Sequence, residues 1–156
     1  DFELTYLNRA KMFIDMDKYD DAIADYNKGI ELNPEISDAY FNRGNMYLSI
    51  DKYDEAIADY TKAIELDPEF LGAYNNRGNA YRMKKEYEKA INDFEQALKI
   101  DSEEVQVYYN IALVYKELGK KDEAIKAYKS FIKYADSSFA SGIEDAKQRI
   151  KDLESQ

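Results

Sequence analysis

The 156-residue chain contains no cysteine, no histidine and no tryptophan, and it has only two prolines and six glycines. Without cysteine it can form neither a disulfide framework nor a thiolate nucleophile. Without histidine it lacks the side chain that most often serves as a general base. We therefore expect no catalytic residues and a protein that is not an enzyme.

The chain also lacks the signatures of phosphate and metal sites. Its few glycines form no glycine-rich phosphate loop. The stretch from Asp15 to Asp21 resembles the beginning of a calcium-binding loop, but Asp20 stands where that loop requires glycine and Tyr26 where it requires glutamate. We expect no bound metal and no other cofactor.

Positive charge is scarce, with 22 lysines and arginines against 32 aspartates and glutamates and a formal net charge of −10. An acidic chain repels phosphate backbones, so we expect no nucleic-acid partner. Long apolar runs are missing too, so we expect no membrane insertion and a soluble protein, with the cytoplasm favoured. Because the chain begins at Asp1 rather than at methionine, we expect it to be a segment of a longer protein.

The dominant positive feature is a repeat of 34 residues, because residues 3–36, 37–70, 71–104 and 105–138 align without gaps. Counted within each unit, position 4 is tyrosine, position 8 is small, position 20 is alanine and position 24 is aromatic. These columns hold Tyr6, Tyr40, Tyr74 and Tyr108; Ala10, Gly44, Gly78 and Ala112; Ala22, Ala56, Ala90 and Ala124; and Tyr26, Tyr60, Phe94 and Tyr128. A fixed period of this length predicts a stack of similar units, each in contact with its neighbours.

Together with Pro34 and Pro68, which close the first two units, these columns resemble the tetratricopeptide repeat. The resemblance covers residues 3–138 and recurs four times. It implies an all-α fold, a right-handed superhelical solenoid of four antiparallel helix hairpins. Residues 1–156 are then expected to form a single domain, with a capping helix at about 139–154.

The predicted capping helix presents Ile143, Ala146, Ile150 and Leu153 on one face. Ser141 and Glu144 have the spacing of a capping box at the beginning of this helix. No equivalent cap precedes residue 3. We therefore expect the N-terminal end of the stack to be open or to self-associate.

Two charged positions of the repeat are replaced together in the fourth unit. Position 7 is arginine and position 23 is aspartate in the first three units, whereas the fourth has Ile111 and Ala127. Joint loss predicts a partly buried, bidentate contact within each hairpin; the alternative is an arginine ladder for anionic ligands. The predicted pairs are Arg9 with Asp25, Arg43 with Asp59, and Arg77 with Asp93.

The resemblance also implies a concave groove, lined by positions 2, 5, 6, 9, 12 and 13 of successive first helices. Asparagine occupies position 6 of every unit, and its amide can pair with both groups of a peptide unit. Two interpretations stay open: a ladder that holds an extended peptide, or asparagines that bond a neighbouring helix or turn. The predicted groove residues are Asn8, Asn42, Asn45, Asn76, Asn79 and Asn110, with Phe41, Tyr109, Lys11, Arg82 and Lys116.

Within this groove, Phe41 and Tyr109 are the predicted anchors for apolar side chains, because exposed aromatic residues often dominate binding energy. Arg82 forms the densest positive cluster together with Lys84 and Lys85. That cluster is either a receptor for a carboxylate or a solvated turn.

The sequence shows whether the chain has the binding residues of one subtype of this family. Its chaperone-binding members grip an acidic C-terminal tail with lysine, arginine and asparagine side chains at fixed positions. In the frame that begins at the second unit, Asn45 and Asn76 match this clamp. Phe41, Gln106 and Asn110, however, stand where the clamp needs cations. We therefore expect this carboxylate clamp to be absent.

The sequence thus predicts a non-enzymatic protein–protein interaction scaffold that binds a peptide segment of a partner protein in its concave groove. Two alternatives remain: a self-assembly module, and the targeting domain of a larger enzyme.

Overall fold

A computed structural model describes residues 2–155, which form nine α-helices and one short 3-10 helix, with no strand in that range. The helices are α1 (Phe2–Ile14), α2 (Tyr19–Leu32), α3 (Ser37–Ser49), α4 (Tyr53–Leu66), α5 (Leu71–Met83), α6 (Tyr87–Ile100), α7 (Val105–Glu117), α8 (Lys121–Tyr134), η1 (Ser137–Phe139) and α9 (Ala140–Glu154). None of the helices within residues 2–155 has both the length and the apolar character needed to cross a bilayer.

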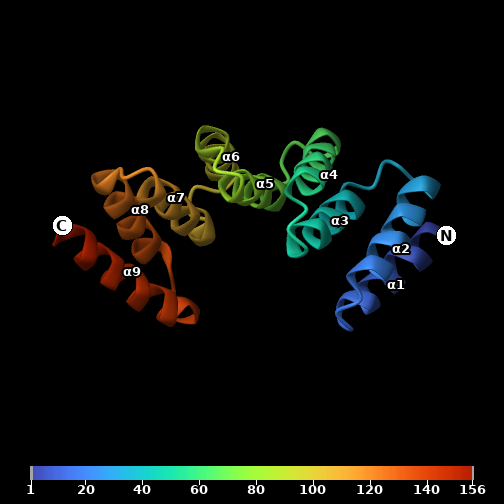
Figure 1. Ribbon diagram of the computed structural model, residues 1–156, viewed down its shortest axis with the longest axis horizontal. Coiled ribbons are helices and arrows are strands. Elements are labelled where there is room, and N and C mark those ends of the chain that lie inside the picture. Colours follow the sequence, from blue (N-terminus) through green and yellow to red (C-terminus); the bar gives the residue numbers. More distant parts are fainter. Residues whose placement is uncertain (1, 156) are drawn as a thin grey trace.

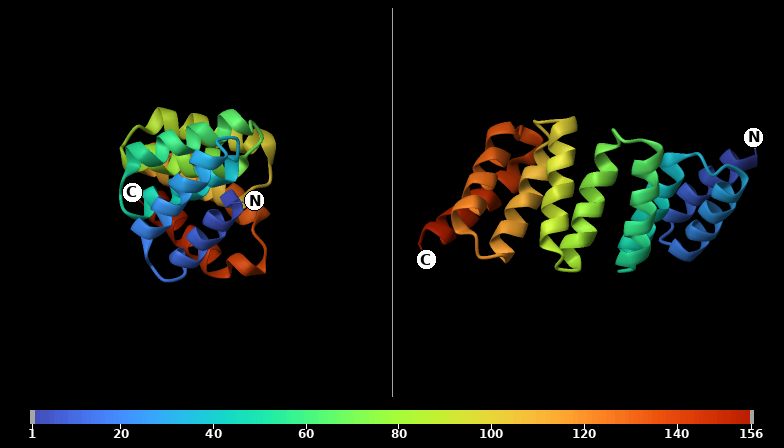
Figure 2. Two further views of the ribbon diagram at one scale, coloured as in Figure 1. Left: turned by 90° about the vertical axis from the view of Figure 1, so that its right-hand side faces the viewer. Right: turned by 90° about the horizontal axis from the view of Figure 1, so that it is seen from above.

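The helices follow one another along an arch that has a chain terminus at each end (Figure 1). α3, α5 and α7 lie along its inner side, and α4 and α6 lie along its outer side. Seen from above, the helices stand side by side in one long row (Figure 2). Successive helices pair as α1–α2, α3–α4, α5–α6 and α7–α8, here called hairpins 1 to 4. The prediction of an all-α repeat solenoid is confirmed.

All four hairpins close through the same turn. Position 15 has a positive φ in each, between 56° and 70°. The next residue donates its backbone N–H to the carbonyl five residues earlier, as Lys52 does to Tyr47 at 2.9 Å. This pattern is the Schellman motif, in which a left-handed residue satisfies the last carbonyls of a helix. The position-15 residues are Asp17, Asp51, Lys85 and Gly119.

Close helix contact within each hairpin depends on the small residue at position 8. A Cβ atom added to Gly44 would lie 2.8 Å from the ring of Tyr60, and one added to Gly78 would lie 2.7 Å from the ring of Phe94. The position-24 aromatic is almost completely buried in every hairpin, with at most 1% of its surface exposed. Burial of each such ring stabilises the fold by about 1.5–3 kcal/mol.

The predicted arginine–aspartate pairs are confirmed and are bidentate. Arg43 donates from Nε and Nη2 to the two carboxylate oxygens of Asp59 at 2.8 and 2.6 Å. A third nitrogen, Nη1, donates to Asn27 of the preceding hairpin at 2.6 Å. Each pair therefore joins two helices, and Arg43 also joins two hairpins. The same bidentate contact forms between Arg9 and Asp25 and between Arg77 and Asp93.

Hairpin 4 replaces this charged pair with an apolar one. Ile111 and Ala127 occupy the two positions, and they are only 8% and 7% exposed. Apolar residues in place of a buried ion pair avoid the cost of removing two charges from water.

α9 covers the end of the stack by burying Ala146, Ile150 and Leu153 against α8. The predicted capping box is wrong. α9 begins at Ala140, so Ser141 lies inside the helix, and its N-cap residue Phe139 makes no side-chain hydrogen bond. The reason is that η1 runs directly into α9. The side-chain cap is instead found at the start of η1, where Asp136 accepts a hydrogen bond from the backbone N–H of Ser138 at 2.8 Å.

The position-24 tyrosines of hairpins 1 and 2 differ in the hydrogen bonding of their hydroxyl groups. The Tyr60 hydroxyl donates to Asn45 Oδ1 at 2.8 Å. The Tyr26 hydroxyl is buried without a hydrogen-bond partner among residues 2–155, because position 9 of its hairpin is Lys11 rather than asparagine. Burial raises the pKa of the Tyr26 hydroxyl to about 12.

We expect Tyr60→Phe to lower the free energy of unfolding by about 1 kcal/mol, since it removes a buried hydrogen bond. Tyr26→Phe is the matched control and should be neutral or stabilising, because it removes a hydroxyl that bonds nothing. Hairpin 3 already has Phe94 at this position. Urea unfolding of both variants measures the difference, and equal losses would contradict this account.

We expect the Arg43–Asp59 pair to show strong energetic coupling. Arg43→Ala or Asp59→Ala alone should cost about 3 kcal/mol, because each leaves the other charge largely buried and unpaired. The double variant should cost at least about 1 kcal/mol less than the sum of the single losses. The control is the exposed pair of Lys28 and Glu31, for which we expect no measurable coupling. Strictly additive losses of stability at Arg43 and Asp59 would contradict the expected coupling between them.

Candidate functional site

The candidate site is the inner surface of the arch, which α3, α5 and α7 line (Figure 1). Successive helices on this side bring together side chains that are 31 to 36 residues apart in the sequence. This arrangement follows from the 34-residue period, because a repeat places equivalent positions of neighbouring hairpins next to one another.

Amide side chains form a continuous hydrogen-bonded chain across three hairpins. Asn76 Nδ2 donates to Asn45 Oδ1 at 2.8 Å, and the Tyr60 hydroxyl donates to the same oxygen. Asn110 Nδ2 donates to Asn75 Oδ1 at 2.9 Å, and Asn75 Nδ2 in turn donates to Asn76 Oδ1 at 3.3 Å. We call these five side chains the amide network. It joins hairpins 2, 3 and 4 through their side chains.

The amide network matches the second interpretation of the asparagine column for three predicted residues, Asn45, Asn76 and Asn110. They bond neighbouring helices, and Asn110 is only 6% exposed. Asn75, the link between hairpins 3 and 4, was missed as a site residue. Its signal was the adjacent asparagine pair at positions 75 and 76 of the sequence.

Three other predicted asparagines lie outside this network. Asn8 is exposed in α1, and Asn42 in α3 and Asn79 in α5 are half-buried. The structure gives their side chains no hydrogen bond to any of residues 2–155. Each of these amides therefore keeps two donors and one acceptor for an external group.

The two predicted aromatic anchors already have partners within the fold. Phe41 packs on Phe70, with ring centroids 4.6 Å apart, and lies over Gly72, where an added Cβ would be 3.3 Å from its ring. It is half-buried at the junction of hairpins 2 and 3. This position leaves only part of the Phe41 ring for contact with another molecule.

Tyr109 belongs to the contact between α7 and α9. Its hydroxyl donates to Asp145 of α9, and its ring meets Phe131 edge-on at 5.2 Å. Burial, followed by this hydrogen bond, raises the pKa of Tyr109 to about 12. The pKa of Asp145 is lowered by hydrogen bonds from Arg149 and then from Tyr109. Tyr109 is therefore part of the attachment of the cap.

The predicted positive cluster is largely neutralised by carboxylates of the same chain. Arg82 donates to Glu117 of the next hairpin at 2.7 Å. Lys84 pairs with Asp54 and Glu86. The two other predicted groove cations, Lys11 and Lys116, are exposed on α1 and α7. Arg82 and Lys84 thus already have carboxylate partners within the described chain.

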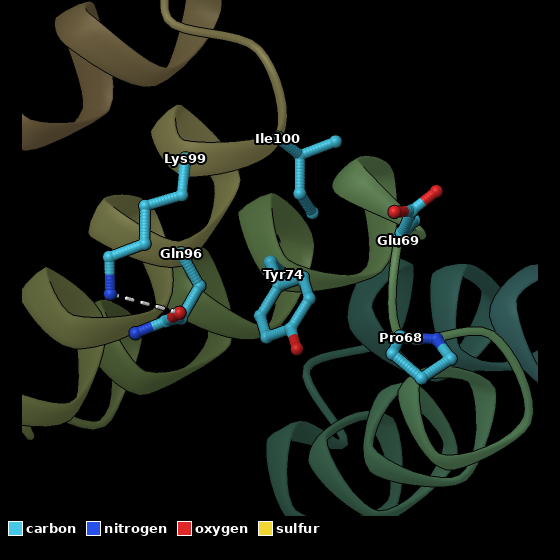
Figure 3. A pocket seen from close by; sticks show the side chains of 6 residues that line it. All are labelled: Pro68, Glu69, Tyr74, Gln96, Lys99 and Ile100. Carbon is cyan, nitrogen blue, oxygen red and sulfur yellow. Dashed lines mark hydrogen bonds between the residues drawn. The ribbon is translucent and has the colours of Figure 1, made fainter.

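A hollow of about 260 Å³ opens elsewhere, between the α4–α5 connection and the C-terminal end of α6 (Figure 3). None of its lining residues belongs to the predicted groove, and Lys99 donates to Gln96 at its rim at 3.2 Å. In hairpin 4 the equivalent tyrosine, Tyr108, is covered by Tyr134, with ring centroids 5.5 Å apart. The lining residues are Pro68, Glu69, Tyr74, Gln96, Lys99 and Ile100.

Comparison with known proteins agrees with this architecture. Models described as "Tetratricopeptide repeat" match residues 37–70, 59–92 and 105–137. A model described as "TPR repeat" matches residues 10–51 and 78–119, which is more than half of the chain. Comparison with curated protein sequences found no match.

Several solved structures are similar in fold. A crystal structure of MamA protein has 27% identity and a TM-score of 0.86, over 97% of this chain and 80% of that one. The second TPR domain of human RPAP3, in complex with the HSP70 peptide SGPTIEEVD, has 31% identity and a TM-score of 0.69, over 71% of this chain and 92% of that one.

The first TPR of Spaghetti (RPAP3), bound to the HSP90 peptide SRMEEVD, has 25% identity and a TM-score of 0.73, over 75% of this chain and 93% of that one. From the repeat-family matches, the hairpin stack and these similarities, we conclude that the chain belongs to the tetratricopeptide repeat family.

Proposed function

We propose that this protein is a non-enzymatic interaction scaffold that binds an extended peptide segment of a partner protein along the inner surface of the arch. The observation that carries the proposal is the pair of half-buried amides, Asn42 and Asn79, whose side chains have no hydrogen-bond partner among residues 2–155, although Asn45, Asn75 and Asn76 beside them on α3 and α5 are bonded. Two similar repeat domains were solved with peptides bound, which supports the same class of ligand here.

The amide network helps such a surface to bind. Hydrogen bonds between Asn45, Asn76 and Asn110 and their partners hold α3, α5 and α7 in a fixed relation. A surface that is ordered before binding loses less conformational entropy when the ligand arrives. Because the flexible peptide must still be ordered, we expect a micromolar dissociation constant.

The ligand need not end in an acidic carboxylate. Phe41, Gln106 and Asn110 replace the cations of the carboxylate clamp, and Arg82 already binds Glu117. The recognised segment is therefore an internal one, held through its backbone by amide groups. The peptide SRMEEVD serves as a negative control in any binding experiment.

Selection from a displayed library of random, unstructured peptides, followed by calorimetry on the selected sequence, tests this proposal. Replacing Asn42 and Asn79 by alanine should weaken binding about thirtyfold, since each lost hydrogen bond is worth about 1 kcal/mol. The two substitutions leave the amide network intact.

Asn92→Ala is the matched control, because Asn92 is exposed on α6 of the outer side and its loss should not change the dissociation constant. If the library yields no binder, or if the double variant binds as tightly as the native chain, the proposed site is wrong.

A second candidate function, self-association, is favoured by the open face of α1. Positions 3 and 10 are buried in hairpins 2 to 4, where they are Ala39, Ala73, Val107, Met46, Ala80 and Val114. In hairpin 1 the same positions are Thr5 and Met12, and Met12 is 65% exposed. Phe2 and Leu4 are exposed beside them. In every later hairpin, the first helix packs against the second helix of the preceding hairpin.

If the open face of α1 self-associates, the protein should form dimers or larger species as its concentration rises. Met12→Glu should return it to a monomer, because the substitution places a charge at the centre of the apolar face. Light scattering across a concentration range measures the mass. A native chain that remains monomeric at every concentration would exclude this candidate.

A further inference from the structure

The outer groove between α7 and α8 contains a hollow of about 230 Å³ that differs from its counterparts in the other hairpins. Its floor consists of Ile111 and Ala127, and its walls are the rings of Tyr108 and Tyr115. Glu123 and Lys126 stand at its rim. Successive residues of an α-helix are rotated by about 100°. The hollow therefore lies on the opposite face of α7 from the positions assigned to the peptide groove.

Hairpins 1 to 3 fill the equivalent space with arginine. The Arg43 guanidinium carbon lies 5.6 Å from the ring of Tyr40 and 6.0 Å from that of Tyr47, so the side chain occupies the slot between two aromatic rings. In hairpin 3 the same kind of hollow is lined by Arg77 and Asp93. Hairpin 4 keeps both tyrosines of the slot but replaces the arginine by the shorter, apolar Ile111. The result is an aromatic slot with an uncharged floor.

The walls of this slot are held in place without a ligand. Tyr108 stacks on Tyr134 with an interplanar angle of 14°, and its hydroxyl donates to the Ser102 carbonyl at 2.8 Å. Lys120 lies 5.9 Å from the ring of Tyr115. A rigid aromatic wall loses little entropy when a side chain packs against it.

Lysines follow the slot along α8. Lys126, Lys129 and Lys133 line a second hollow that shares Lys126 with the first. All three are exposed, although Lys129 lies 3.7 Å from Glu154 and Asp122 lies in the same hollow. Residues 105–138 contain six lysines and four acidic residues, a net charge of +2, although the whole chain has a charge of −10. This part of the molecule therefore attracts acidic partners that the rest repels.

We propose that the slot between Tyr108 and Tyr115 is a second docking site, which receives an apolar side chain from an acidic segment of a partner protein. An aliphatic or aromatic side chain of the partner buries itself on Ile111 and Ala127, and acidic residues beside it pair with Lys126 and Lys129. A guest arginine is disfavoured because Ala127 replaces the aspartate that binds each internal arginine. The site goes beyond the proposed peptide groove and does not depend on it.

NMR titration of the ¹⁵N-labelled chain with three synthetic peptides tests this site. The peptides are Glu-Glu-Leu-Glu-Glu and its versions with alanine or arginine at the centre. The leucine peptide should shift the amide signals of Ile111, Lys126 and Ala127, and the alanine peptide should bind about tenfold more weakly because it buries less apolar area. Added salt should weaken both.

The most decisive variant introduces into hairpin 4 the arginine–aspartate pair of the other three hairpins. Ile111→Arg with Ala127→Asp should fill the slot, reduce the affinity for the leucine peptide about tenfold and leave the alanine peptide unaffected. Lys126→Gln with Lys129→Gln should weaken both peptides and reduce the salt dependence. Circular dichroism checks that each variant is folded, and the lysine variant keeps the test decisive if the transplanted pair disrupts hairpin 4.

The control is the variant with Asn42→Ala and Asn79→Ala, which should bind the leucine peptide normally, so a failure of the peptide groove and a failure of this site are distinguishable. The proposal is overturned if the signals that shift belong to the inner surface. It is also overturned if the arginine peptide binds more tightly than the leucine peptide, or if the transplanted pair changes nothing. If the signals of Ile111, Lys126 and Ala127 shift without peptide as the protein concentration rises, a second copy is the occupant and the proposal is overturned as well.

Discussion

The whole stack depends on one contact, a small residue of the first helix against a buried aromatic ring of the second. At Gly44 and Gly78 the ring comes so close that even a Cβ atom would collide. This contact sets the distance between paired helices, and the identical Schellman turns set where the second helix begins. Because both features recur at a fixed period, each hairpin presents the same flank to the next one, and an arch results.

The four hairpins share this packing, but sequence differences between them create distinct surfaces. The bidentate arginine–aspartate pair is structural in hairpins 1 to 3, and its third nitrogen connects Arg43 and Arg77 to the preceding hairpin. Where hairpin 4 loses the pair, an apolar slot appears on the outer side. On the inner side, asparagines either bond one another or remain available. The same positions thus pack against neighbouring helices in one hairpin and leave an accessible surface in another.

The sequence was sufficient for the fold and for contacts inside a hairpin. The period gave the helix pairs, and the joint loss at Ile111 and Ala127 revealed the ion pairs. Contacts between hairpins were harder to foresee. The bond between Asn110 and Asn75 and that between Tyr109 and Asp145 depend on how far one hairpin rotates on the next, which no local pattern encodes. For the same reason, residues predicted for a ligand proved to hold neighbouring helices. The expected capping box of Ser141 and Glu144 does not form, because α9 follows directly from η1 and already begins at Ala140.

The amide network has a consequence for how the molecule comes apart. Its hydrogen bonds link hairpins 2, 3 and 4, but neither Asn8 nor Lys11 of hairpin 1 takes part in it. The Arg9 side chain is 55% exposed, compared with 17% for Arg43. Among residues 2–155, the side-chain hydrogen bond from Arg43 to Asn27 is the one that joins hairpin 1 to hairpin 2, whereas hairpins 2 and 3 share those of Asn76, Arg77 and Lys84. We therefore expect amide protons to exchange with solvent fastest in hairpin 1. Fraying from this end would leave a smaller, still cooperative body of three hairpins and the cap.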